Sequence, residues 1–375
     1  MRQQFQTNHD MKAKIHRVLT ASGIWGSVLT AIATLALADQ AAADNLAAIR
    51  HFNESGNFLI ADQFNNRVIE IDPAGRIVWS FGRGPNDFSD QSIIGVNDAE
   101  RVGNLTLMAG TGTPSGFIPQ APDGVVDNRV LLVDPAGKIV WQYGQFGQTG
   151  SAADLLSSPV QCTFLPNSDV LITDQGNNRV IEVSLAKQIV WSYPGSNENP
   201  TDQLAGPNSA ELLANGDILI ADQGNNRAIE VTRADQIVRT FTAGGTASIV
   251  AFASRLPNGN TLLTDSGNAR VVEVNASDRV VWQYYTDTDP LSVAAPQPTR
   301  AVRLRNGETL ISDQFNHRVL LVSHSGWIMA RYGSPLAGGD VIGNNAGYNR
   351  LSSQAGLYCP YDAKAIGDYT GLTWP

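Results

Sequence analysis

Cysteine and histidine are scarce in this chain of 375 residues. Its only cysteines, Cys162 and Cys359, could form one disulfide at most, and a chain of this length can bury enough core to fold without one. Three histidines lie beyond the N-terminal segment. We expect His51 at the end of a strand, His317 in a turn, and His324 in a turn at the opposite end of the strands. This separation disfavours a histidine metal site or a histidine nucleophile.

Common catalytic motifs and excess positive charge are also absent. The chain has no Gly-x-Ser-x-Gly, His-Glu-x-x-His, Cys-x-x-Cys-His or phosphate-loop sequence. Lysine and arginine total 26 against 35 acidic residues, a formal net charge of −9. An acidic chain is a poor partner for nucleic acid or for anionic membrane surfaces, so neither is expected to bind.

Long hydrophobic runs are missing except near the N-terminus, where the sequence predicts a signal peptide. Lys12, Lys14 and Arg17 precede an apolar run centred on residues 24–37. The alanines at 36 and 38 form a cleavage site after residue 38, and a second candidate site ends at residue 43. Serines and glycines dilute the run below the roughly 20 strongly apolar residues of a membrane span, which favours cleavage over an anchor.

Cleavage after residue 38 would remove four basic residues and one acidic residue, which changes the net charge from −9 to about −12. The expected mature protein is residues 39–375, with no membrane span. It is expected in the periplasm or outside the cell.

What the chain does contain is a repeat. The stretch Asp62-Gln63-Phe64-Asn65-Asn66-Arg67 recurs nearly unchanged from Asp174 and Asp222, more loosely from Asp265 and Asp313, and in degraded form at 127–129. A period of roughly 40–60 residues is typical of propellers, solenoids or arrays. Each copy contains four short apolar runs separated by turn sequences, which predicts a four-stranded antiparallel sheet. The fourth run, often Ile-Val-Trp, is apolar on both faces, which predicts burial between neighbouring sheets.

The Asp-x-x-Asn-x-Arg turns resemble those of the NHL-repeat β-propellers over about residues 46–333. The resemblance implies an all-β, six-bladed β-propeller of four-stranded antiparallel blades; seven blades with a partial last blade is the alternative. The repeats are expected at about 46–82, 95–144, 158–193, 206–241, 248–285 and 298–333. Residues 360–368 align with the first strand of a repeat and are expected to join the first sheet and close the ring.

One copy of the turn motif per repeat is what a constraint of the fold produces, and the resemblance implies a structural role for its Asp, Asn and Arg. The residues assigned to this structural motif are Asp62, Asn65, Arg67, Asp174, Asn177, Arg179, Asp222, Asn225, Arg227, Asp265, Asn268, Arg270, Asp313, Asn316 and Arg318.

Positions that change from repeat to repeat are where a site could be built. The first strands align on one column of small residues, expected beside the ring axis, and variable polar residues flank it. The candidate ligand-binding residues are Asp98, Glu100, Gln161, Glu211, Arg300 and Asp362. The insert at 110–124 is expected at the same end of the strands. Because carboxylates dominate the set, the cofactor they would suit is a divalent cation such as Ca²⁺. The alternative is a solvated polar channel without a ligand.

The expected function is a binding or interaction scaffold that uses its rim and axial mouth for a protein or small-molecule ligand. The Ile-Val-Trp-Gln-Tyr strands bear a more distant resemblance to arylsulfotransferase repeats. Because the acidic axial residues could converge on a divalent metal, a hydrolase or lyase that uses them with such a metal is the first alternative. A structural subunit of a larger assembly is the second. The missing catalytic motifs favour a protein that is not an enzyme.

Overall fold

The computed structural model describes residues 51–194, 202–333 and 356–368, and regular structure in these ranges is almost entirely β-strand. The predicted signal peptide lies outside the described residues. None of the helices in the described ranges is long and apolar enough to cross a membrane.

The strands form six antiparallel sheets of four strands each, called blades 1 to 6 from here on. Blade 1 runs from the inside outward as β24 (Pro360–Ala365), β1 (Phe58–Asp62), β2 (Arg67–Ile71) and β3 (Ile77–Phe81). Blade 2 contains β4 (Val96–Val102), β5 (Leu105–Gly110), β6 (Arg129–Val133) and β7 (Ile139–Tyr143). Blade 3 contains β8 (Pro159–Phe164), β9 (Val170–Asp174), β10 (Arg179–Val183) and β11 (Ile189–Tyr193).

The other three blades repeat the pattern. Blade 4 contains β12 (Ser209–Leu212), β13 (Ile218–Asp222), β14 (Arg227–Val231) and β15 (Ile237–Phe241). Blade 5 contains β16 (Val250–Arg255), β17 (Thr261–Asp265), β18 (Arg270–Val274) and β19 (Val280–Tyr285). Blade 6 contains β20 (Pro298–Arg303), β21 (Thr309–Asp313), β22 (Arg318–Val322) and β23 (Ile328–Gly333).

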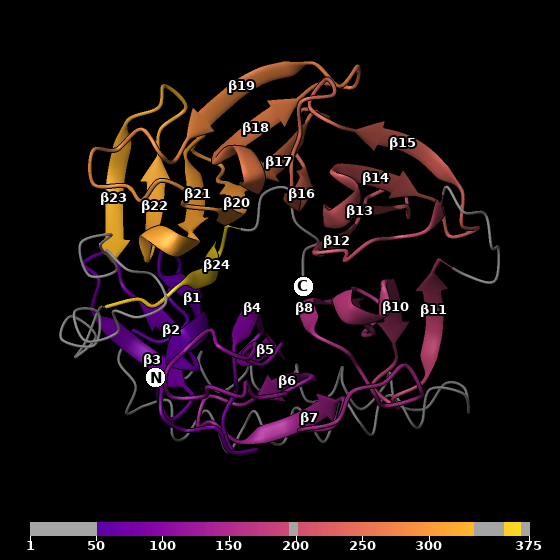
Figure 1. Ribbon diagram of the computed structural model, residues 1–375, viewed down its shortest axis with the longest axis vertical. Helices are drawn as coiled ribbons and strands as arrows, with labels where there is room; N and C mark the ends of the chain where they lie inside the picture. Colours follow the sequence, from indigo (N-terminus) through magenta and orange to yellow (C-terminus); the bar gives the residue numbers. More distant parts are fainter. Residues whose placement is uncertain (1–50, 195–201, 334–355, 369–375) are drawn as a thin grey trace, which may run out of the picture. The chain divides into compact units, whose positions relative to one another are not determined.

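The innermost strands close a ring. Each contacts the innermost strand of the next blade, in the order β24, β4, β8, β12, β16, β20 and back to β24 (Figure 1). The predicted six-bladed β-propeller is confirmed, and the seven-bladed alternative is wrong.

The C-terminal strand β24 completes blade 1. It pairs with β1 in antiparallel register from Phe58↔Ala365 to Asp62↔Pro360, in the position expected for the tail segment. His51, expected at the end of a strand, instead lies in an exposed turn, because β24 already occupies the inner edge of this sheet.

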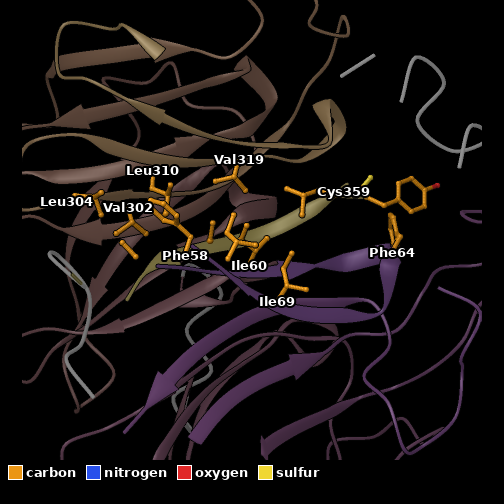
Figure 2. Packing of buried hydrophobic residues seen from close by; sticks show 14 of the residues in the cluster. Phe58, Ile60, Phe64, Ile69, Val302, Leu304, Leu310, Val319 and Cys359 are labelled. Carbon is orange, nitrogen blue, oxygen red and sulfur yellow. The ribbon is translucent and has the colours of Figure 1, made fainter. Parts of the chain in front are cut away.

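The apolar core lies between neighbouring blades. Figure 2 shows the core between blades 1 and 6, where Phe58, Ile60 and Ile69 pack with Leu310 and Val319. Because these residues come from opposite ends of the chain, this core holds the closure of the ring together.

The outermost strands are less buried than the sequence predicts. The second residue of the Ile-Val-Trp run is 53% exposed at Val190, 49% at Val238 and 53% at Val281, and its counterpart Met329 is 57% exposed. The expectation of two buried faces is therefore wrong for blades 3 to 6, because the gap between radial sheets widens towards the outside.

Candidate functional site

The recurring turn motif clamps the linker that enters its own blade. In blade 3, the Nε of Arg179 and the Nδ2 of Asn177 each donate to Oδ2 of the buried Asp174, both at 2.7 Å. The other oxygen of Asp174 accepts the backbone N–H of Ser157 at 2.7 Å, and Arg179 donates to the carbonyl of Ser151 at 2.9 Å. The Asp–Arg ion pair is present in all six blades. These contacts hold the turn and the entering linker together, which is a structural role.

His317 also makes a structural contact, which joins blade 6 to the closing strand. Asn178 and Asn226, at the equivalent turn position, each accept a backbone N–H from the linker of the next blade at 2.7 Å. Nδ1 of His317 accepts the N–H of Cys359 at 3.1 Å in the same way, between blade 6 and the closing strand. Cys162 and Cys359 are free thiols, and burial raises the pKa of both well above the ordinary value. A buried protonated thiol is a poor nucleophile.

The six candidate axial residues are all buried. None of Asp98, Glu100, Gln161, Glu211, Arg300 and Asp362 is more than 6% exposed. The alternative of a solvated polar channel lined by these six residues is therefore wrong, because their side chains are buried where the inner strands approach one another.

Most of these side chains join one blade to the next. Oδ2 of Asp98 in blade 2 accepts the backbone N–H of Cys162 in blade 3 at 3.1 Å. Oε1 of Gln161 in blade 3 accepts the N–H of Ala210 in blade 4 at 2.6 Å. Both backbone donors, Cys162 and Ala210, are small residues of the column expected beside the axis, so the column marks where adjacent blades come into contact.

A second row of contacts lies two residues further along the inner strands. Glu100 accepts the backbone N–H of Phe164 in blade 3 at 2.5 Å, and Glu211 accepts that of Arg255 in blade 5 at 3.0 Å. Burial raises the pKa of Glu100 to about 8 and that of Glu211 well above its ordinary value. Glu100 is therefore expected to be protonated at neutral pH.

Four of the axial groups form an ionic cluster whose charges balance. Nζ of Lys364 lies 2.7 Å from Asp98 and 2.5 Å from Asp362. The guanidinium of Arg300 lies 3.4 Å from Asp98 and 3.2 Å from Asp362, and it stacks on the ring of Phe252 at 4.5 Å. Two cations face two carboxylates, so the negative charge that the sequence analysis matched to a divalent cation is balanced by Lys364 and Arg300.

The pKa values follow from this cluster. Burial alone would raise the pKa of Asp98, but Lys364 and Arg300 hold it below its ordinary value. Burial raises the pKa of Asp362, which shares the same two cations. Lys364 was not among the predicted site residues, although it occupies the same position in its strand as Glu100 and Glu211 do in theirs.

A metal site is not supported at the axis. In the part of the chain that the structure describes, no group of three or more His, Cys, Asp or Glu residues could hold a metal ion. Asp98 and Asp362 are directed at Lys364 and Arg300, which take the place that a cation would need.

The expected axial mouth is bridged by side chains. The hydroxyl of Tyr361 in blade 1 lies 2.8 Å from Nδ2 and 3.1 Å from Oδ1 of Asn208, which precedes the inner strand of blade 4 on the other side of the ring. At the same end, Gln63 donates to Asn97 at 2.7 Å and accepts from Gln314 at 2.8 Å. A ligand would have to break these contacts to enter.

The insert between β5 and β6 lies at this same end, as expected. The rings of Phe117 and Phe64 lie 5.2 Å apart, and Ile118 and Ala121 are buried in the core between blades 1 and 6. Phe64 belongs to the 3₁₀ turn η1 (Gln63–Asn65), so the tip of the insert is anchored on blade 1.

Apolar side chains are exposed on the outer edge of blades 5 and 6. We define the blade 5–6 patch as Tyr285, Leu291, Trp327 and Met329, which are 37%, 44%, 74% and 57% exposed. A cleft of about 390 Å³ lies beside Trp327, lined by Tyr284 and Pro290 from one side and by Trp327 and Ile328 from the other.

No protein-family model matches this sequence, and no curated protein matches it. The resemblance to NHL-repeat proteins therefore remains a resemblance of motifs. Among solved structures, virginiamycin B lyase from Staphylococcus aureus matches at 14% identity and a TM-score of 0.44, over 63% of this chain and 69% of that one. A protein of unknown function from Bacteroides caccae matches at 13% identity and a TM-score of 0.48, over 74% of this chain and 93% of that one. These similarities say nothing about a substrate or partner.

Proposed function

We propose that this chain is an exported NHL-type propeller that acts as an interaction scaffold and binds a protein partner on the blade 5–6 patch. Export is supported by the basic residues, apolar run and alanine cleavage site near the N-terminus. The repeated Asp-x-x-Asn-x-Arg turns support the relationship to NHL-repeat proteins. The proposed binding surface is therefore the outer edge of blades 5 and 6 and not the axial mouth that the sequence predicted.

The observation that carries the proposal is Trp327. Its carbonyl accepts the backbone N–H of Ser323 in a turn that all six blades share. The equivalent residues in blades 1 to 5 are Arg76, Lys138, Gln188, Gln236 and Arg279. The fold accepts a polar side chain at this position in five blades, so a tryptophan that is 74% exposed is not needed for folding.

The composition of the patch suits a protein partner. Tryptophan and tyrosine are enriched among the residues that dominate protein–protein binding energies, and methionine is enriched at such interfaces. Arg331 lies at the patch and pairs with Asp289 at 2.5 Å, which gives the apolar side chains a polar margin. Two copies of the mature chain would each carry a net charge of about −12, so mutual repulsion disfavours self-association.

Site-specific crosslinking in the cells that produce the protein tests this proposal. A photoreactive phenylalanine derivative is placed at Met329 in the full chain, and at Val238 in a matched control, because Val238 is 49% exposed on the outermost strand of blade 4. We expect one discrete adduct from position 329, its loss in the additional presence of Trp327→Gln, and no such adduct from position 238. Equal labelling from both positions, or an adduct with the mass of two copies, would contradict the proposal.

The enzyme alternative has weaker support. The acidic axial residues on which it depended accept hydrogen bonds from the neighbouring blade or form ion pairs with Lys364 and Arg300. A buried carboxylate that is already paired is not available to a substrate without disrupting the ring.

A further inference from the structure

Trp327 brings an unpaired hydrogen-bond donor to the cleft beside the blade 5–6 patch. Its indole N–H makes no hydrogen bond with any residue in the described ranges, and the residue is 74% exposed. The tryptophans of the outermost strands differ, because each donates its indole N–H to a backbone carbonyl of the neighbouring blade, at 2.7–3.3 Å for Trp79, Trp141, Trp191 and Trp282. A ligand in the cleft can therefore reach a donor that the fold does not use.

Tyr284 in β19 brings a second donor to the same cleft. Tyr143, Tyr193 and Tyr332 occupy the equivalent position in blades 2, 3 and 6, and each of their hydroxyls makes a hydrogen bond with a backbone group. The hydroxyl of Tyr284 makes no such bond in the part of the chain that the structure describes, and it is not one of the fully enclosed polar atoms. Burial raises the pKa of Tyr284, so the hydroxyl stays protonated and can donate.

The acceptors of the cleft are less available than its donors. Asp289 is the one carboxylate of the described lining, and one of its oxygens accepts from Arg318 at 2.6 Å and from Arg331 at 2.5 Å. Its other oxygen accepts the backbone N–H of Leu291 at 3.0 Å. The cleft therefore combines aromatic and apolar walls with free donors, and its carboxylate is already occupied.

We propose that the partner docks a proline-rich, extended segment in this cleft. This inference rests on the proposed function and names the part of the partner that the cleft takes. Proline has no backbone N–H, so such a segment brings carbonyl acceptors and needs no acceptor in return. In the polyproline II conformation all of its carbonyls are left unpaired, and aromatic-lined grooves are the surfaces on which such segments dock.

The size of the cleft and the charge of the chain fit a short segment of this kind. A volume of about 390 Å³ lies at the small end of ligand sites, which suits roughly one turn of a polyproline II helix, or about three residues. The net charge of the mature chain, about −12, favours a segment with basic flanks over one with acidic flanks. Because a proline-rich segment is extended before it binds, docking costs it little conformational entropy.

Peptide titration of the full chain tests this inference. The probe is an acetylated peptide of six prolines followed by two lysines, and its matched control has six alanines followed by two lysines. Binding is followed by calorimetry and by the NMR signal of the Trp327 indole N–H, which is assigned from its loss in Trp327→Phe. We expect the proline peptide to bind with a Kd of about 1 mM or lower, and the alanine peptide to bind at least about tenfold more weakly.

Matched variants locate the docking site. Tyr284→Phe removes one hydroxyl and keeps the ring, and the fold accepts phenylalanine at this position, as Phe81 and Phe241 show in blades 1 and 4. We expect it to weaken binding of the proline peptide roughly three- to tenfold, the range for one hydrogen bond. Tyr332→Phe is the control, because the hydroxyl of Tyr332 donates to the carbonyl of Pro73 at 3.1 Å and does not line this cleft. Its effect on the affinity is expected to stay below about twofold.

Three results would overturn the inference. One is no binding of the proline peptide at about 10 mM, and another is equal affinity for the alanine peptide. The third is an equal loss of affinity in Tyr284→Phe and Tyr332→Phe. Cellobiose is titrated as a further probe, and binding of cellobiose at the Trp327 signal without binding of the proline peptide would assign the cleft to a carbohydrate instead.

The crosslinking experiment distinguishes a failure of this inference from a failure of the proposed function. A discrete adduct from position 329, together with no binding of the proline peptide, would keep the proposed function and overturn only the inference about proline. Absence of the adduct would contradict the proposed function, and with it this inference.

Discussion

Two sets of positions in this propeller change from blade to blade, and they differ in burial. The axial positions of Asp98 and Glu211 are buried, and each accepts a backbone N–H of the neighbouring blade. The outer position of Trp327 is 74% exposed, and its side chain replaces polar residues in a turn that folds equally well with them. Variation between repeats therefore does not identify a binding site by itself. It has to be combined with exposure, or with a polar group that lacks a partner.

Removing the closing strand is expected to have the largest effect on folding. A chain that ends at Tyr358 lacks β24, which exposes the edge of β1 and removes Lys364 and Asp362 from the axial cluster. Exposed strand edges aggregate, so we expect an insoluble product without a cooperative unfolding transition. Circular dichroism during heating and size-exclusion chromatography provide the measurement. A soluble monomer with a sharp transition would show that the axial layer is dispensable.

The ionic cluster should be the most sensitive single part of the axial layer. Lys364→Met leaves Asp98 and Asp362 with Arg300 alone, and breaking a buried ion pair typically costs about 3–5 kcal/mol. The matched control is Lys187→Met, because Lys187 is 39% exposed and pairs with Asp154 at 3.2 Å, a contact worth at most about 1 kcal/mol. Urea unfolding compares the two. Similar losses in both would mean that the buried cluster does not stabilise the ring.

The turn motif should show an intermediate effect. Arg179→Ala leaves the buried carboxylate of Asp174 without its cation, which we expect to cost about 1–3 kcal/mol. Arg76→Ala is the control, because Arg76 is 75% exposed beside Asp72. Thermal unfolding gives the two values. A normal melting temperature for Arg179→Ala, combined with a selective loss of partner binding, would assign this arginine to the function instead of the fold.

The pH dependence of stability distinguishes the buried carboxyl group of Glu100 from the carboxylates of the ionic cluster. Burial raises the pKa of Glu100 from 4.5 to about 8 in the folded state. Its contribution to stability is therefore fully present below pH 4.5 and is lost as the pH rises through 8. Glu100→Gln cannot ionise, so we expect it to equal the wild type near pH 4 and to become progressively more stable than the wild type as the pH rises to 8. Parallel curves from pH 4 to 8 would show that Glu100 does not titrate in this way.

The fold could be predicted because each sequence repeat corresponds to one blade. The turn from Asp174 to Arg179 recurs in five blades with the same ion pair, and the shortened turn of blade 2 keeps the pair between Asp127 and Arg129, so one interpretation applies to all six. The burial of Asp98 and Asp362 could not be predicted, because it depends on Lys364, which pairs with both carboxylates. Lys364 reaches the axis only because the C-terminal strand closes the ring. The exposed Trp327 could have been found by aligning the turns before each fourth strand, where the other repeats have arginine, lysine or glutamine.

The crosslinking yield from position 329 in two backgrounds, Trp327→Gln and Glu211→Gln, decides whether the partner binds at the outer edge or at the axis. The account predicts that Trp327→Gln abolishes the adduct while stability changes by less than about 0.5 kcal/mol, because the side chain is mostly exposed. It also predicts that Glu211→Gln retains the adduct, because Glu211 is buried and bonded to blade 5. Loss of the adduct in Glu211→Gln at unchanged stability, with full yield in Trp327→Gln, would contradict the account and return the function to the axis.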